Sequence, residues 1–145
     1  MQNNIPGLKL DFSKSPTIWK LLNDKSFVRG LIGPVGSGKS YACCAEIFKR
    51  AIQQKPSLRD GIKYSRFVIV RNSYPMLKTT TLKTWLELFP EHIYGSVHHS
   101  PPITHHIKLP SRDGAAGIDC EVIFLALDQP KDTRKLLSLE ITGAW

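Results

Sequence analysis

The amino-acid sequence predicts an α/β fold with a mostly parallel sheet. Short, continuous runs of apolar and β-branched residues, which are typical of strands buried on both faces, recur along the chain. They alternate with segments whose apolar residues recur at helical spacing. A glycine-rich stretch lies between the first such strand and the first long helix. Alternation of this kind is the pattern of strand–helix–strand units.

The first half of the chain begins with an irregular arm over residues 1–15 and then alternates between the two patterns. Pro16 begins a segment with three apolar residues at helical spacing, and a short apolar run precedes the glycines. An apolar helical stripe follows the glycines until Pro56, and the run "RFVIVR" comes next. We therefore expect a helix over residues 16–23, a strand over 27–32, a helix over 39–54 and a strand over 66–71.

The second half continues this alternation. Leu82, Trp85, Leu86 and Phe89 recur at i, i+3, i+4 and i+7, and Pro90 ends that helix. The run "CEVIFLALD" is typical of a buried strand. The other expected elements are an edge hairpin around residues 103–109, a strand over 120–128, a helix over 131–137 and a strand that begins at "EITGAW". Residues 16–145 are thus expected to form one domain or part of one.

Composition limits the classes of protein to which the chain can belong. Its 145 residues are 41% hydrophobic, which is enough to build a core. Three cysteines are too few for a disulfide framework, which favours a reducing, cytosolic setting. No apolar run has the length of a membrane span, and the first residues lack the apolar core of a signal peptide. The formal net charge of +8 favours a nucleic-acid partner, with a merely basic surface as the alternative.

The stretch "GPVGSGKS", residues 33–40, matches the pattern G-x-x-x-x-G-K-[ST] of loops that bind nucleotide phosphates. Glycines let the backbone approach the phosphates, and the N-terminus of the next helix adds partial positive charge. In this pattern the lysine contacts the β- and γ-phosphates, and the serine hydroxyl binds Mg²⁺. The alternative is a glycine-rich turn before a helix. The predicted ligands are ATP and Mg²⁺, and the predicted binding residues are Gly33, Pro34, Val35, Gly36, Ser37, Gly38, Lys39 and Ser40.

Three classes of nucleotide-binding protein have to be compared. A GTPase needs an N-K-x-D motif to recognise the base, and the chain has none. A small-molecule kinase does not need so basic a surface. A motor ATPase that acts on nucleic acid needs basic surface, an acidic motif and an arginine. Asp128, after six apolar residues, is a candidate acid for the metal, although Gln129 stands where a paired glutamate is expected. Its alternative role is to cap the helix that begins near Pro130.

Two later blocks resemble the ATPase domain of the large terminase subunits of tailed bacteriophages, which are DNA-packaging motors. The blocks are "VIVRNSYPMLKTTTLKTWLELFPE", residues 68–91, and "FLALDQPKDTRKLLSLEITGAW", residues 124–145. With the phosphate loop, the resemblance covers most of residues 15–145. It implies a P-loop NTPase fold of the RecA-like (ASCE) type, incomplete at its C-terminus. In that family the acidic pair ends the strand that begins here at "EITGAW", so the resemblance places the pair just beyond Trp145 and disfavours Asp128.

The resemblance also implies an activity and its partners. The complete protein is expected to couple ATP hydrolysis to the movement of double-stranded DNA into a procapsid, and its nuclease domain is expected to lie outside this chain. The implied partners are DNA, a small terminase subunit, a portal protein and sister subunits in a ring, without a membrane. The implied location is the host bacterial cytoplasm and, transiently, the portal vertex. The alternatives are a helicase-like ATPase that uses Asp128 as its metal acid, and a nucleotide-binding module without activity.

Two arginines are candidate catalytic residues beside Lys39. Arg71 ends the strand that follows the phosphate-loop helix, at the edge of the sheet where ligand sites form, and could sense the γ-phosphate. Its alternative role is an ion pair with a nearby acid. Arg134 lies shortly before the last strand and could act across a subunit interface as an arginine finger. Its alternative is an exposed position on a helix.

Other chemically distinctive residues have simpler structural interpretations. Cys43 and Cys44 are expected to pack behind the phosphate loop. Trp19 is expected in the core, with a place beside the adenine as the alternative. Two histidine pairs lack a cysteine pair at zinc-ligand spacing, so exposed positions on a loop or hairpin are favoured over a metal site. These histidines are His98, His99, His105 and His106.

Overall fold

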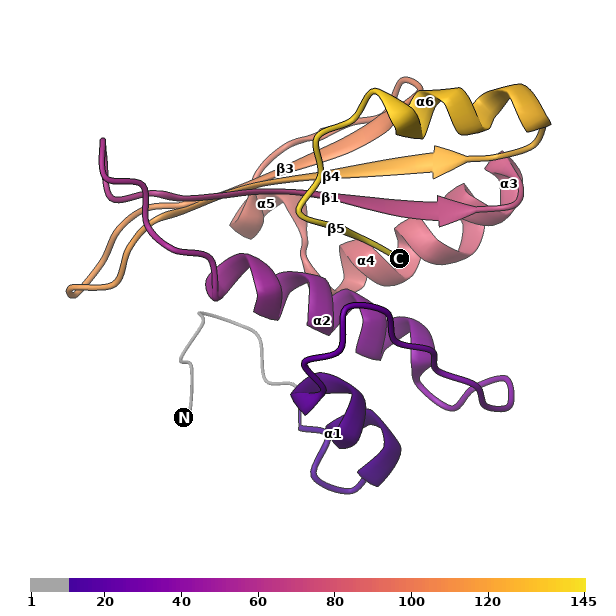
Figure 1. The fold of residues 1–145 in the computed structure, drawn as a ribbon, viewed down its shortest axis with the longest axis horizontal. Coiled ribbons are helices and arrows are strands. Elements are labelled where there is room, and N and C mark those ends of the chain that lie inside the picture. The colour runs from indigo at the N-terminus through magenta and orange to yellow at the C-terminus, as the bar shows by residue number, and fades with distance from the viewer. Residues whose placement is uncertain (1–10) are drawn as a thin grey trace.

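A computed structural model describes residues 11–145, except for the side chains of Pro130 and Lys135. The expected arm over residues 1–15 lies partly outside the described residues, and residues 11–15 belong to no helix or strand. The described residues contain one sheet with helices on both of its faces (Figure 1). The elements of the first half are α1 (Pro16–Asn23), α2 (Lys39–Ile52), β1 (Lys63–Arg71), α3 (Tyr74–Met76), η1 (Leu77–Thr81) and α4 (Leu82–Leu88). Those of the second half are α5 (Glu91–Tyr94), β2 (Val97–His98), β3 (Ile103–Leu109), β4 (Ile118–Ala126), η2 (Pro130–Asp132), α6 (Thr133–Leu137) and β5 (Gly143–Ala144).

The sheet is mixed, whereas the sequence predicted a mostly parallel one. Its strand order is β2-β3-β4-β1-β5, and β4 and β5 both pair with β1 in parallel. In contrast, β3 pairs antiparallel with both β4 and β2. The connections explain this difference. The short segments between β2 and β3 and between β3 and β4 cannot hold the crossover that a parallel pair needs.

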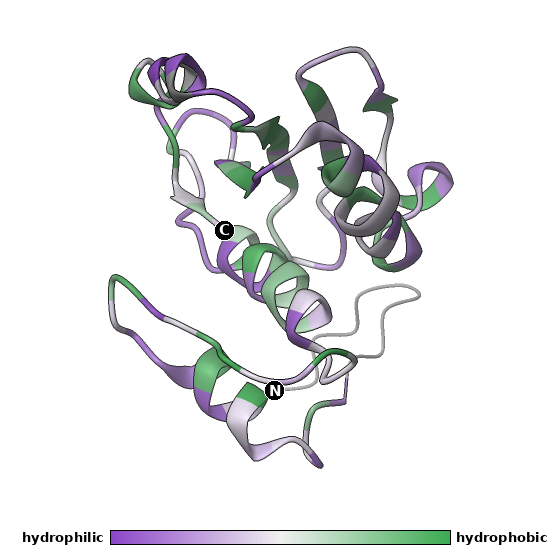
Figure 2. Ribbon diagram, turned by 90° about the vertical axis from the view of Figure 1, so that its right-hand side faces the viewer, coloured by the Kyte–Doolittle hydropathy of each residue, from purple (hydrophilic) through white to green (hydrophobic). Residues whose placement is uncertain are grey.

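Helices cover the two faces of the sheet unequally. One face packs against α2, α4 and α5, and α6 lies over the carboxyl half of the other face (Figure 1). Helix α2 runs between the sheet and α1 (Figures 1 and 2). Its N-terminal end lies on the side of the molecule toward which the arrowheads of β1 and β4 point. The start of α2 and the carboxyl ends of the parallel strands therefore face the same side.

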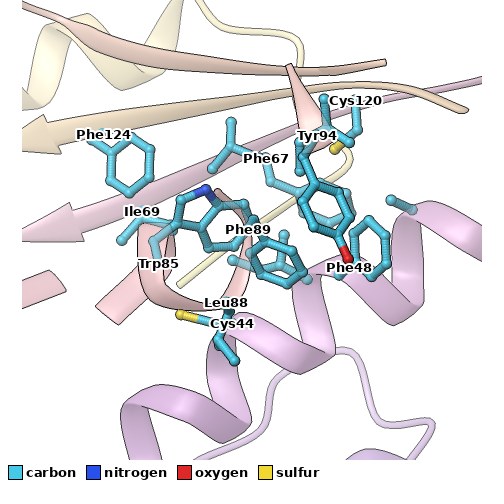
Figure 3. Packing of buried hydrophobic residues seen from close by; sticks show 14 of the residues in the cluster. Cys44, Phe48, Phe67, Ile69, Trp85, Leu88, Phe89, Tyr94, Cys120 and Phe124 are labelled. Atoms are coloured by element: carbon cyan, nitrogen blue, oxygen red, sulfur yellow. The ribbon is translucent and has the colours of Figure 1, made fainter. Parts of the chain in front are cut away.

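The apolar residues of α2 and α4 build the core, as the sequence periodicity predicted. The aromatic side chains pack edge to face or tilted, with the ring centroids of Trp85 and Phe89 4.4 Å apart and those of Phe48 and Phe89 4.9 Å apart (Figure 3). Phe124 of β4 lies against Trp85 with 5.9 Å between ring centroids. Burying large aromatic groups in this way supplies much of the stabilisation of a small domain.

The expected strand over residues 27–32 is wrong. These residues form neither a helix nor a strand, and Phe27 and Ile32 are 102% and 97% exposed. A strand needs a hydrogen-bonded neighbour, and none of the described strands pairs with this segment. The apolar run in front of the phosphate loop therefore has strand-forming residues but no ladder partner within residues 11–145.

The helix predicted over residues 82–89 begins earlier, at Tyr74. The Ser73 hydroxyl accepts a hydrogen bond from the Met76 amide and so caps the first turn. Between α3 and α4, η1 is a π-helical turn in which the amide of Leu82 donates to the carbonyl of Leu77, five residues back. The helical run over residues 74–88 therefore contains one extra residue in a single turn.

The hairpin predicted around residues 103–109 is confirmed as β2 and β3, but one of its histidines is not exposed. His105 is fully buried, whereas His98, His99 and His106 are exposed. Alternation along β3 turns His105 inward with Ile103 and Ile107. The indole of Trp85 donates to Nδ1 of His105 over 2.8 Å, and Nε2 donates to the Gly95 carbonyl over 2.9 Å. Both ring nitrogens of a neutral imidazole are thus satisfied.

The burial of His105 predicts a dependence of stability on pH. Burial lowers the pKa of His105 below the usual 6.5, partly offset by the Gly95 hydrogen bond and the Glu91 carboxylate and reinforced by His106. In the unfolded chain this histidine is protonated below about pH 6.5, whereas in the folded chain its protonation requires a lower pH. The contribution of neutral His105 to the free energy of unfolding should therefore be complete above about pH 6.5. It should decrease as the pH falls toward the lowered pKa.

Urea unfolding at pH 7.5 and at pH 5.5 measures this effect. We expect His105→Gln to be less stable at pH 7.5 and to lose less stability between the two pH values than the unmodified chain. His98→Gln, at an exposed position, should keep the full pH dependence. An equal pH dependence in His105→Gln and the unmodified chain would assign the effect to other groups.

Candidate functional site

The loop over residues 33–40 makes a tight turn into the N-terminus of α2. Gly36 and Gly38 both have φ of +78°, a left-handed conformation that favours glycine. Gly38 is the N-cap of α2, and no side chain accepts a hydrogen bond from the first amides of this helix. The amide groups at the start of α2 are therefore open to an external acceptor, and the helix dipole adds partial positive charge there.

The Lys39 side chain folds back over the loop. Its ammonium group donates to the carbonyls of Gly33 and Pro34, with N–O distances of 2.7 and 2.5 Å, and to the Ser37 hydroxyl over 3.2 Å. A phosphate group would offer this ammonium stronger, charged acceptors than these neutral oxygens. Space at Gly33 is limited, because a Cβ atom there would lie 3.1 Å from the Ser37 hydroxyl. The loop thus brings one cation, one helix N-terminus and two hydroxyl side chains, Ser37 and Ser40, together.

Contacts with α1 and α2 hold the chain in front of the loop. The Arg29 guanidinium donates to Glu46 of α2 over 2.6 Å and to the Leu21 carbonyl at the end of α1 over 3.1 Å. Arg50 donates to the same carboxylate oxygen over 2.6 Å and to the Asp24 carbonyl over 3.0 Å. This partly buried cluster ties the end of α1 and the segment before the loop to α2. Only the Glu46–Arg50 spacing of four residues could have indicated it from the sequence.

Arg71 lies at the carboxyl end of β1, as predicted, but it does not pair with an acid. Within the described residues it forms no ion pair; its Nε donates to the Thr81 hydroxyl over 2.7 Å, and its guanidinium carbon lies 5.1 Å from the centroid of the Trp145 ring. The proposed alternative role in an ion pair is therefore wrong for the part of the chain that the structure describes. The contacts with Thr81 and Trp145 were not predicted, because both depend on long-range packing.

The candidate metal acid Asp128 and the candidate catalytic residue Arg134 do not contact the loop. Asp128 is exposed two residues beyond the end of β4, which ends beside Arg71 of β1. Arg134 is exposed on α6, across the sheet from α2 (Figure 1). Among the residues described, neither side chain forms a hydrogen bond or an ion pair with residues 33–40. Any role of Arg134 at this loop would require a second copy of the chain.

The cysteines near the loop are packing residues, whereas Trp19 is not. Burial raises the pKa of the Cys43 thiol to about 11, partly opposed by the Arg71 guanidinium, and raises that of the Cys44 thiol to about 12. Both thiols are therefore poor nucleophiles at neutral pH. Trp19 is 60% exposed on α1, so its expected place in the core is wrong.

The described residues hold neither a metal-binding cluster of side chains nor a helix that could span a membrane. No three His, Cys, Asp or Glu side chains gather closely enough to hold a metal ion among residues 11–145, and this includes the histidine pairs. None of the helices described is long and apolar enough to cross a bilayer. A Mg²⁺ ion at Ser40 would therefore need oxygen ligands from the nucleotide and from water, which is usual for this ion.

Comparison with protein families, with curated proteins and with solved structures found no match to this chain.

Proposed function

We propose that residues 33–40 bind the phosphates of ATP·Mg²⁺. The observation that carries this proposal is the uncapped N-terminus of α2, which follows two left-handed glycines and lies beside the Lys39 ammonium. Its open amides and nearby cation form a site for a polyanion. ATP is favoured over GTP because the sequence lacks the N-K-x-D motif that reads guanine. Ser40, in the first turn of α2, would bind Mg²⁺.

Calorimetric titration of the 145-residue chain with ATP tests this proposal. We expect a dissociation constant below about 100 µM with Mg²⁺, weaker binding when EDTA removes the metal, and far weaker binding of AMP, which lacks the β- and γ-phosphates. No binding of ATP·Mg²⁺ at millimolar concentration would refute the proposal.

We further propose that this nucleotide site belongs to a DNA-packaging motor. Support comes from the resemblance of residues 68–91 and 124–145 to bacteriophage large terminase subunits, and from the net charge of +8. The complete protein would act in the bacterial cytoplasm and at the portal vertex. It would bind double-stranded DNA through backbone phosphates, because a motor has to move along any sequence. A small terminase subunit, a portal ring and sister subunits would be its protein partners.

A helicase-like ATPase is the second candidate. It is favoured by one observation: Asp128 follows the strand that pairs in parallel with β1 and ends beside Arg71. Measurement of phosphate release in the titration samples distinguishes the two candidates. The motor hypothesis expects very slow hydrolysis of ATP by residues 1–145, because the resemblance to terminases places the acidic pair outside them. Fast turnover that is lost in Asp128→Asn, but kept in Asp113→Asn, would instead favour the helicase-like candidate.

A further inference from the structure

Arg71 is a partly buried cation that no carboxylate neutralises among the described residues. Burying a charge is costly unless hydrogen bonds or an opposite charge compensate it. A single hydrogen bond from Nε and one aromatic face leave the two terminal nitrogens of the guanidinium available to an external acceptor. Their planar, forked arrangement suits the oxygens of a phosphate.

The position of Arg71 places this guanidinium near the phosphate loop. Arg71 ends β1, which packs against α2, and the N-terminal end of α2 lies on the side of the molecule toward which β1 points (Figure 1). Lys39 and Ser40 are the first two residues of α2. Arg71 and the residues that would hold the β- and γ-phosphates therefore lie on the same side of the molecule, at the carboxyl end of β1 and the N-terminal end of α2.

The π-helical turn η1 supplies the hydroxyl that holds Arg71. Three consecutive threonines end this turn. The first two, Thr79 and Thr80, are exposed and donate their hydroxyls back to helix carbonyls four residues earlier, over 2.7 and 2.6 Å. Thr81 is only 1% exposed, and its hydroxyl oxygen accepts the Nε–H of Arg71. Thr81, in the π-helical turn, is therefore the one threonine of the three whose hydroxyl contacts β1, and turns of this type are frequent at functional sites.

Trp145 holds the other side of the guanidinium. Its amide donates to the Val68 carbonyl over 2.9 Å, and its carbonyl accepts from the Val70 amide over 2.6 Å. These two bonds fix the backbone of Trp145 beside β1, so that its ring lies against the Arg71 cation. The Thr81 hydroxyl and the indole ring together restrict the rotamers of a long, otherwise flexible side chain.

We propose that Arg71 binds the γ-phosphate of the nucleotide at residues 33–40, and that Thr81 and Trp145 are the positioning residues that orient it. This inference rests on the proposed function. It assigns a role to the π-helical turn, because the turn places Thr81 against β1. It also links occupancy of the γ-phosphate position to the helix over residues 74–88.

Replacement of Thr81 by valine tests the positioning role, because valine keeps the shape and removes the oxygen. Affinities for ADP and for a non-hydrolysable ATP analogue, both with Mg²⁺, are measured by calorimetry. We expect Thr81→Val to lose about tenfold or more in affinity for the ATP analogue while its affinity for ADP stays unchanged. Thr81→Ser should retain both affinities. Thr80→Val is the matched control, since it removes a neighbouring hydroxyl that bonds only to its own helix, and it too should retain both.

The outcomes separate this inference from the proposed function. Equal affinities of the unmodified chain and Thr81→Val for the ATP analogue would overturn the inference and leave the phosphate site intact. Equal losses for ADP and the ATP analogue would also overturn it, because they would indicate a purely structural role. Failure of the unmodified chain to bind either nucleotide would refute the proposed function, and the inference with it.

Tryptophan emission provides a second measurement that does not require a Thr81 variant to fold. In Trp19→Phe, which removes the exposed indole, the remaining indoles are the buried Trp85 and the half-buried Trp145. Binding of the ATP analogue should change the emission of Trp145 as the guanidinium moves against its ring, whereas ADP should not. Arg71→Lys in the same background should abolish the change. The same emission change with ADP, or none with either bound nucleotide, would overturn the inference.

Discussion

Replacement of Lys39 by alanine is expected to weaken the binding of ATP·Mg²⁺ by about 30-fold or more. The lysine would lose charge-assisted hydrogen bonds to phosphate oxygens, and each such bond contributes about 1.5–3 kcal/mol. The loop itself should tolerate the change, because residues 33–37 are exposed and water can hydrogen-bond to the carbonyls of Gly33 and Pro34. The free energy of unfolding should thus stay within about 0.5 kcal/mol of that of the unmodified chain.

Calorimetry with ATP·Mg²⁺ and urea unfolding of the same samples check both parts of this prediction. Lys83→Ala is a suitable control, because Lys83 is exposed on α4. This substitution also removes one positive charge. If both variants lose affinity equally, the effect reflects net charge and not the loop. Unchanged affinity in Lys39→Ala would remove Lys39 from the nucleotide site.

Replacement of Gly95 by alanine is expected to destabilise the fold by about 3 kcal/mol or more. Gly95 has φ of +123° and ψ of 176°, a conformation that is essentially restricted to glycine. A Cβ atom there would lie 2.2 Å from the carbonyl oxygen of His106. This oxygen cannot move away easily, because β3 is paired with β4 along its whole length. The Gly95 carbonyl also accepts the hydrogen bond from buried His105, so any shift of Gly95 would disturb the core.

Gly30→Ala is the matched control for this substitution. A Cβ atom at Gly30 would meet nothing within 4 Å, and its φ lies outside the left-handed region. We expect its free energy of unfolding to stay within about 0.5 kcal/mol of the original value or to increase slightly. Urea unfolding monitored by circular dichroism compares the two variants. Similar stabilities would mean that the chain at Gly95 adapts more easily than its packing indicates.

The parts of the fold that follow from local pattern were predictable. The stripe on α2 buries Cys44, Phe48 and Ala51 at helical spacing, and the run in β4 is buried as a central strand should be. The segment over residues 27–32 has the same strand-forming composition but lacks a neighbour to complete its hydrogen bonds. Strand formation depends on that neighbour, and composition does not report it.

Alternation could have identified one residue that the sequence interpretation misplaced. His105 stands between Ile103 and Ile107 at intervals of two, so a strand that buries both isoleucines also buries the histidine. At the candidate site, the loop over residues 33–40 was evident from its glycines and lysine. The π-helical turn and the contacts of Thr81 and Trp145 with Arg71 were not. The contacts of Arg71 join three separate segments of the chain, and the spacing of residues within one segment does not predict contacts between segments.

The buried thiols make this chain convenient for site-specific labelling. Burial raises the pKa of Cys120, like that of Cys43, to about 11, and that of Cys44 to about 12, so very little thiolate exists at neutral pH. Maleimide dyes react with the thiolate and should leave all three native cysteines largely unmodified while the chain is folded. A single cysteine introduced at exposed Val35 could then carry a fluorophore on the phosphate loop itself, without removal of the native thiols.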